Sequence, residues 1–71
     1  MNLLRIRERL TGGFKPFVIE LSSGRRLEVP HPEFVIVGRN VVGVLTERDV
    51  IVSIDPLHIV SVEDLPVKKR K

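Results

Sequence analysis

The apolar positions at the start of the chain follow the repeat of a helix. Leu3, Ile6 and Leu10 are spaced i, i+3 and i+7, which puts them on one helix face. The Gly12-Gly13 pair that follows favours an end to the helix, because glycine takes the left-handed conformation at little cost. We therefore predict a short amphipathic helix over residues 2–11.

After this segment the apolar repeat changes from helical to two. Phe17, Ile19 and Leu21 alternate with their neighbours, as expected for a strand with one buried face. Residues 22–25 contain two serines and a glycine and predict a tight turn. Residues 26–29 alternate again and predict the return strand. Together these segments indicate a β-hairpin.

The later strands are separated by residues that interrupt a β-ladder. Pro30-His31-Pro32 must end the hairpin, since proline has a fixed φ and no backbone N–H to donate. Asp55-Pro56 is a second break, and Leu57-His58 is expected to form a single helical turn. The strands predicted between and after these breaks cover residues 33–37, 41–45, 50–54 and 59–62.

These elements favour one fold class. The connections are tight and no crossover helix is available, so the sheet must be antiparallel. A short sheet rich in valine and isoleucine hides its edges best by curling into a barrel. We predict a mostly β protein, a small SH3-like antiparallel barrel of five to six strands with a short N-terminal helix.

Length and composition add expectations about assembly and location. The 71 residues suffice for one domain at 1–65, followed by a basic tail at 66–71 that we expect to be disordered. So short a chain is marginally stable alone, and it has no cysteine to form a disulfide. With 42% apolar residues, we expect it to gain stability as a homo-oligomer. The sequence lacks a signal peptide and an apolar run near ~20 residues, which favours a cytoplasmic protein that does not enter a membrane.

The sequence contains no catalytic or metal-binding motif. The two histidines are far apart and cysteine is absent, so zinc would find too few nitrogen or sulfur ligands. His31 sits between two prolines, with no serine or cysteine nearby in sequence for it to activate. The glycines lack the spacing of a phosphate loop. We therefore expect no enzyme activity, no cofactor, no metal and no small-molecule substrate.

The net charge of +3 is unevenly distributed along the chain. Residues 10–67 hold five basic and eight acidic side chains, so the body is slightly acidic. The basic side chains gather in the helix, as Arg5, Arg7 and Arg9, and in the tail, as Lys68, Lys69, Arg70 and Lys71. Such groups can contact phosphates, and their contribution to nucleic-acid affinity depends on salt.

Several segments resemble the Sm-like fold in its bacterial Hfq-like form. They are Arg7-Glu8-Arg9 on the helix, Ile-Glu-Leu-Ser-Ser-Gly-Arg-Arg-Leu at 19–27, Glu-Phe-Val-Ile at 33–36 and His-Ile-Val-Ser-Val at 58–62. The resemblance implies a ring-shaped homo-oligomer, built by pairing of edge strands, that binds single-stranded RNA as an RNA chaperone. It places Arg7 and Arg9 on a basic rim and Phe34 and His58 near a uridine-binding pore.

A second pattern is similar to that of a set of small bacterial proteins without an assigned function. It consists of Lys-Pro-Phe-x-Ile-x-Leu-x-x-Gly-Arg at 15–25 and Val-Pro-His-Pro-Glu-Phe at 29–34. This resemblance implies a bacterial protein that functions as a separate chain.

Two functions remain open on the sequence alone, and the family resemblance makes the first of them our prediction. One is an oligomeric Sm-like protein that binds RNA through Arg5, Arg7, Arg9, Phe34, His58 and the tail residues 68–71. The other is a protein-interaction or structural barrel with no nucleic-acid role, in which open strand edges pair with neighbouring subunits or a partner peptide. The acidic body favours the second, as do Leu57, where the Hfq-like pattern has a lysine, and Glu33, where it has a glutamine.

Overall fold

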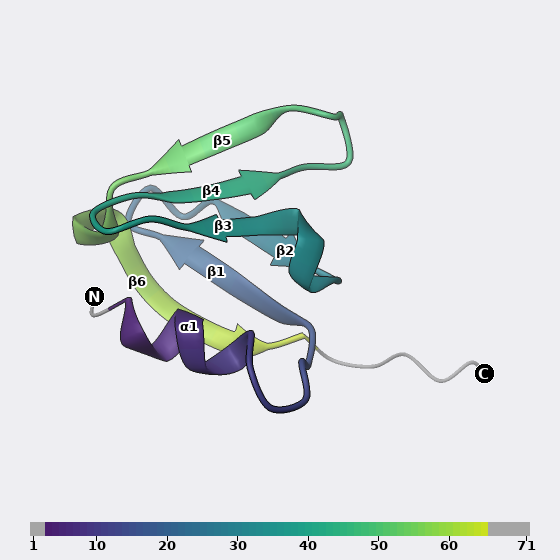
Figure 1. Cartoon of the computed structure of the whole chain (residues 1–71). Coiled ribbons are helices and arrows are strands. Elements are labelled where there is room, and N and C mark those ends of the chain that lie inside the picture. Colours follow the sequence, from purple (N-terminus) through teal and green to yellow (C-terminus); the bar gives the residue numbers. More distant parts are fainter. Residues whose placement is uncertain (1–2, 66–71) are drawn as a thin grey trace.

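A computed structural model describes residues 3–65 as one helix, six strands and two short 3-10 helices. In chain order the elements are α1 (Leu4–Arg9), β1 (Phe17–Leu21), β2 (Arg26–Val29), η1 (Pro32–Phe34), β3 (Val35–Val37), β4 (Val42–Leu45), β5 (Ile51–Ile54), η2 (Pro56–His58) and β6 (Ile59–Asp64). Figure 1 shows α1 and the β4–β5 hairpin at opposite sides of the molecule.

The strands form two antiparallel sheets of three strands each. The first sheet has the order β2-β1-β6, and the second has the order β3-β4-β5. In the first, Ile19 faces Leu27 on one side and Val62 on the other. In the second, Val44 faces Val35 and Val52. The predicted antiparallel hairpin is thus confirmed, and the last strand returns to pair with the first.

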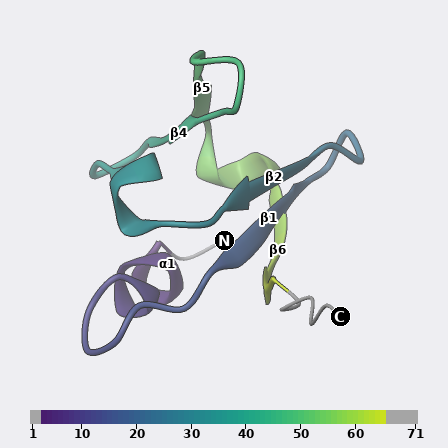
Figure 2. The ribbon, with the colours of Figure 1, turned by 90° about the vertical axis from the view of Figure 1, so that its right-hand side faces the viewer.

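The inward faces of both sheets and one face of α1 share a single core. It consists of Ile6, Phe17, Ile19, Leu27, Val29, Val35, Val42, Val44, Ile54 and Ile59. Every strand and the helix contribute at least one of these side chains, so no element is stable by local propensity alone. Figure 2, turned from the first view, shows the helix beside the sheet that contains β1 and β6.

The helix packs on the face predicted from the apolar spacing. Ile6 is fully buried, and Leu3 and Leu10 pack against the core. The helix is shorter than the predicted range 2–11, because Leu3 and Leu10 are its caps and residue 2 lies outside the described residues.

Several predicted boundaries were wrong by one or two residues, for reasons that lie in the turns. The strand expected at 33–37 begins only at Val35, because Pro32 starts a 3-10 helix that carries Phe34. Val41 and Val50 belong to turns, while β6 continues two residues beyond the predicted end to Asp64. The single helical turn was correct: it spans Pro56–His58.

The mostly β class with one short helix is confirmed. Within residues 3–65 the strands pair as two three-stranded sheets, and no strand pairing joins one sheet to the other. In the same part of the chain, no helix is long and apolar enough to cross a membrane.

Candidate binding cleft between the two sheets

Two of the outer strands, β2 and β5, each border a hollow in the surface. Because β2 is an outer strand of the first sheet and β5 an outer strand of the second, each has one side without a partner strand in the described structure. Leu21 donates its N–H to the Arg25 carbonyl, so by alternation the backbone groups of Arg26 and Glu28 point away from β1. Thr46 donates to the Val50 carbonyl, which likewise turns the backbone of Ser53 away from β4.

The cleft consists of two adjoining hollows. The larger, of about 410 Å³, is lined by Arg25, Arg26, Leu27, Glu28, Thr46, Glu47 and Arg48. The smaller, of about 260 Å³, is lined by Leu21, Ser22, Ser23, Arg25, Val52, Ser53, Ile54, Asp55 and His58. Arg25 lines both, so the two hollows adjoin at this residue, between β2 with its preceding turn and β5 with its flanking turns. We call the two hollows together the inter-sheet cleft.

The turns on both sides of the cleft are fixed by backbone geometry. Gly24 has φ 93°, which favours glycine, and donates its N–H to the Leu21 carbonyl over 2.8 Å. On the opposite wall Asp49 has φ 65° and donates to the Thr46 carbonyl over 2.9 Å. Arg25 directly follows Gly24, and Arg48 directly precedes Asp49. The two turns therefore determine the backbone positions from which these arginine side chains extend.

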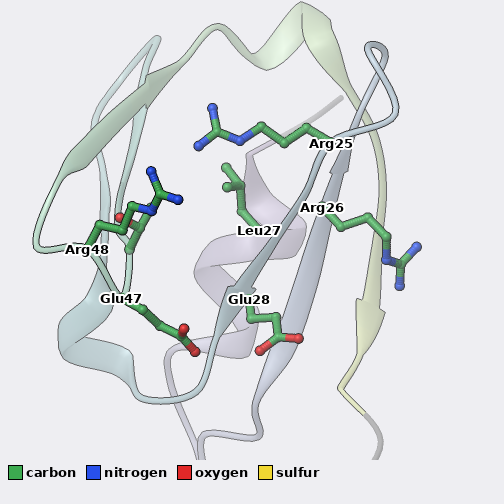
Figure 3. A pocket seen from close by; sticks show the side chains of 7 residues that line it. Arg25, Arg26, Leu27, Glu28, Glu47 and Arg48 are labelled. Carbon is green, nitrogen blue, oxygen red and sulfur yellow. The ribbon is translucent and has the colours of Figure 1, made fainter.

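Charged side chains in the larger hollow are separated along its length. Figure 3 shows the guanidinium groups of Arg25 and Arg48 turned toward the space between the two walls, with Leu27 between them. Glu28 and Glu47 lie at the other end of the same hollow. The cleft therefore has a basic end and an acidic end above a floor that includes an apolar side chain.

Arg26 differs from its neighbours because it is paired. Its guanidinium lies 3.3 Å from the Glu20 carboxylate and 3.8 Å from that of Glu63. Ser61 on β6 also donates its hydroxyl to Glu20, over 3.4 Å. Arg25 donates its backbone N–H to the Ser23 hydroxyl, but within residues 3–65 neither the Arg25 nor the Arg48 guanidinium forms an ion pair or a hydrogen bond.

His58 lies in the smaller hollow and contacts the β1–β2 turn. Its Nδ1 is 3.3 Å from the Ser22 hydroxyl, and its carbonyl accepts the Ser22 N–H over 2.7 Å. The Asp55 carboxylate accepts the Leu57 N–H, so it caps η2 and does not orient the imidazole. A hydrolytic triad needs the histidine between the hydroxyl and the carboxylate, which is not the arrangement here. The contacts between His58 and Ser22 instead connect η2 to the β1–β2 turn.

Two of the three helix arginines predicted to contact RNA are engaged with the protein. Arg7 donates to the Gly38 carbonyl over 3.0 Å. Arg9 forms an ion pair with Asp64 and lies 5.6 Å from the centroid of the Phe17 ring. Arg5 lines a small polar hollow beside the helix. The two engaged arginines therefore fasten α1 to both sheets.

The Arg9 contact also changes the titration of Asp64. The hydrogen bond from Arg9 and its positive charge lower the pKa of Asp64 below its usual value, with a smaller contribution from Lys15. Slight desolvation acts in the opposite direction and is outweighed. The ion pair thus favours the charged carboxylate in the folded protein.

Phe34 and His58 were predicted to lie near one pore, but they line different hollows. Phe34 is half-buried, and its ring centroid is 5.7 Å from that of His31. It borders a hollow of about 100 Å³ with Ile36 and Ile51 on the second sheet, where His58 takes no part. The remaining predicted residues, Lys68, Lys69, Arg70 and Lys71, lie outside the described residues.

The outer face of the second sheet is apolar. Ile36 on β3 and Ile51 on β5 are 67% and 64% exposed, which is unusual for side chains of this size. Gly43 lies between them on β4, where a Cβ would come within 3.7 Å of Ile51. We call this surface, with Phe34 and Leu45, the outer apolar face.

Sequence reasoning missed the unpaired arginines of the cleft. Arg25 follows the β1–β2 turn and Arg48 lies within the β4–β5 turn, but the sequence did not show that the two turns approach each other. Among residues 3–65 no group of three or more histidine, cysteine, aspartate or glutamate side chains is placed to hold a metal ion. No protein-family model matches the chain, no curated protein matches it, and no solved structure matches its fold.

Proposed function

We propose that this protein is a protein-interaction module whose inter-sheet cleft receives an extended segment of a partner chain as an added strand. The observation that carries the proposal is the pair of free edges: β2 lines the larger hollow, β5 lines the smaller one, and Arg25 borders both. A strand edge offers unpaired N–H and C=O groups that another chain can use. Each backbone hydrogen bond so formed contributes about 0.5–1.5 kcal/mol.

The two free edges are short, because β2 and β5 have four residues each. Four residues span about 13 Å at a rise of about 3.3 Å per residue. An extended segment of about eight residues, about 26 Å long, would therefore cover the whole of either edge. The floor residue Leu27 and the inward-facing Val52 offer apolar contact for alternate side chains.

Removing one backbone donor from the β5 edge tests the proposal. Ser53→Pro deletes an N–H that faces the cleft and not β4, whereas Ser53→Ala removes the same hydroxyl and keeps the N–H. The probe is an acetylated, amidated peptide of about eight alternating threonine and valine residues with a central glutamine. We expect saturable binding to the natural chain and to Ser53→Ala, and weakened binding to Ser53→Pro. Equal affinities for all three, with folding checked by circular dichroism, would contradict edge pairing.

The Sm-like, RNA-binding function is a second proposal. It is favoured by the chain order of helix, hairpin, later hairpin, 3-10 turn with His58 and a last strand that returns to β1. In this proposal β2 and β3 act as one bent strand, and the two sheets form a partly open Sm-like barrel. Binding of a short uridine-rich RNA should fall with added salt and weaken in Arg7→Ala with Arg9→Ala. Unchanged affinity in that double variant would refute the predicted rim.

Self-association also remains a proposal, and the outer apolar face is where we expect it. Large exposed apolar side chains on a flat sheet face are typical of contact surfaces between proteins. Because a two-fold assembly joins the same patch of two copies, Ile36 or Ile51 of one subunit would lie in the shallow site above Gly43 of the other. Light scattering on the natural chain and on Ile51→Lys measures this directly.

A further inference from the structure

We infer that the segment bound by the inter-sheet cleft is acidic, and that its carboxylate lies between Arg25 and Arg48. This inference rests on the proposed function, since it specifies the chemistry of the partner that the cleft would take. It goes further because it places an acidic side chain of the partner at the arginine end of the cleft. This placement also determines the direction in which the partner strand runs.

The first support is the state of the two guanidinium groups. Arg25 and Arg48 come from opposite walls, both line the larger hollow, and both are turned toward the space between the walls (Figure 3). Nearby carboxylates do not neutralise them: within residues 3–65 neither arginine has an ion pair. Arg26, the residue after Arg25, has two ion pairs. The N–H donors of the Arg25 and Arg48 guanidinium groups are therefore available to a ligand in the cleft.

The second support is geometric. An arginine offers a planar fork of N–H donors that matches the two oxygens of a carboxylate. Leu27 lines the floor of the hollow between the two arginines (Figure 3). Both arginines are exposed, so their guanidinium groups can turn to a carboxylate from opposite walls.

The third support is the opposite charge at the far end. Glu28 and Glu47 line the same hollow, and Figure 3 shows them away from the two guanidinium groups. Arg25 and Glu28 are three residues apart along one strand, which corresponds to about 10 Å. A partner strand with an acidic residue at the arginine end and a basic residue about three positions away would meet opposite charges at both ends. The reverse direction would place like charges together.

The test compares two peptides on four forms of the protein. The probe is the threonine–valine peptide described above with a lysine about three positions after its centre, made with either glutamate or glutamine at the centre. The forms are the natural chain, Arg25→Ala, Arg48→Ala and a control, Arg39→Ala, which loses the same charge from the β3–β4 turn, outside the lining of the cleft. Calorimetric titration at about 0.15 M salt gives each affinity.

We expect the glutamate peptide to bind the natural chain about fivefold or more tightly than the glutamine peptide. Arg25→Ala and Arg48→Ala should remove that preference, while Arg39→Ala should keep it. If the arginines contact the carboxylate directly, each arginine substitution should weaken binding of the glutamate peptide much more than binding of the glutamine peptide.

The possible failures are distinct. Equal binding of both peptides to the natural chain, with Ser53→Pro still weakening both, would overturn the acidic partner and leave the proposed function standing. No binding of either peptide at millimolar concentration would contradict the proposed function itself. A glutamate preference that survives both Arg25→Ala and Arg48→Ala would place the carboxylate elsewhere and overturn the assignment of the two arginines.

Discussion

The attachment of α1 can be tested through its one fully buried side chain. Ile6 has no exposed surface and packs into the core shared by both sheets. Replacing a buried isoleucine with alanine costs about 2–5 kcal/mol, which combines lost transfer free energy with the cavity left behind. A chain of 71 residues has a free energy of unfolding of roughly 4–11 kcal/mol. Ile6→Ala should therefore remove at least about a fifth of the total stability, and about half of it in the middle of both ranges.

Urea denaturation followed by far-ultraviolet circular dichroism is the suitable assay, because the chain has neither tryptophan nor tyrosine. With a slope near 1 kcal/mol per molar urea, the midpoint should fall by about 2–5 M. The matched control is Leu4→Ala on the same helix, whose side chain is 54% exposed, and its midpoint should change by less than about 0.5 M. If the two substitutions shift the midpoint equally, α1 does not pack on the sheets through Ile6 and the reasoning fails.

Three further outcomes follow from the described contacts. Because the pKa of Asp64 is lowered in the folded protein, the stability from its ion pair with Arg9 is present above the ordinary carboxyl pKa near 3.8 and is lost as the pH falls through the lower folded value. Urea midpoints measured from neutral pH down to strongly acidic pH should thus decrease less in Asp64→Asn than in the natural chain; parallel curves would contradict the pairing. Gly24 has φ 93° and open space around an added Cβ, so Gly24→Ala should lower the free energy of unfolding by about 1 kcal/mol through backbone strain alone. An unchanged free energy of unfolding would show that the turn adopts another conformation. Ile51→Lys should leave the urea midpoint nearly unchanged and reduce the mass measured by light scattering; a large midpoint loss in a monomer would mean that Ile51 is part of the core.

Much of the fold was predictable because it depends on local alternation of apolar residues. The spacing of Leu3, Ile6 and Leu10 identified the buried helix face, and the alternation from Phe17 identified the first hairpin. The start of β3 was not predictable in the same way, because Pro32 allows both an extended strand and a 3-10 turn. The surrounding packing decides between these conformations, and local sequence does not contain that information.

The candidate site was less predictable because it depends on contacts far apart in sequence. Arg7 and Arg9 were chosen as charges on an exposed helix face, but their partners, Gly38 and Asp64, lie more than 30 residues away. Likewise, Arg25 and Arg48 come together only because two separate turns lie on opposite walls of one cleft. Strand order and register determine both outcomes, and a single sequence specifies neither directly.

The direct test of the central claim, that the inter-sheet cleft is a binding site for a protein segment, is a pair of titrations followed by amide chemical shifts. One uses the glutamate peptide, and the other uses a uridine-rich RNA of roughly twelve nucleotides, both at about 0.15 M salt. The account predicts that the peptide shifts the amides of β2, β5 and the 46–49 turn, while the RNA shifts none of them. Perturbation of the helix around Arg5 and Arg7 by the RNA, with no response of β2 and β5 to the peptide, would contradict it.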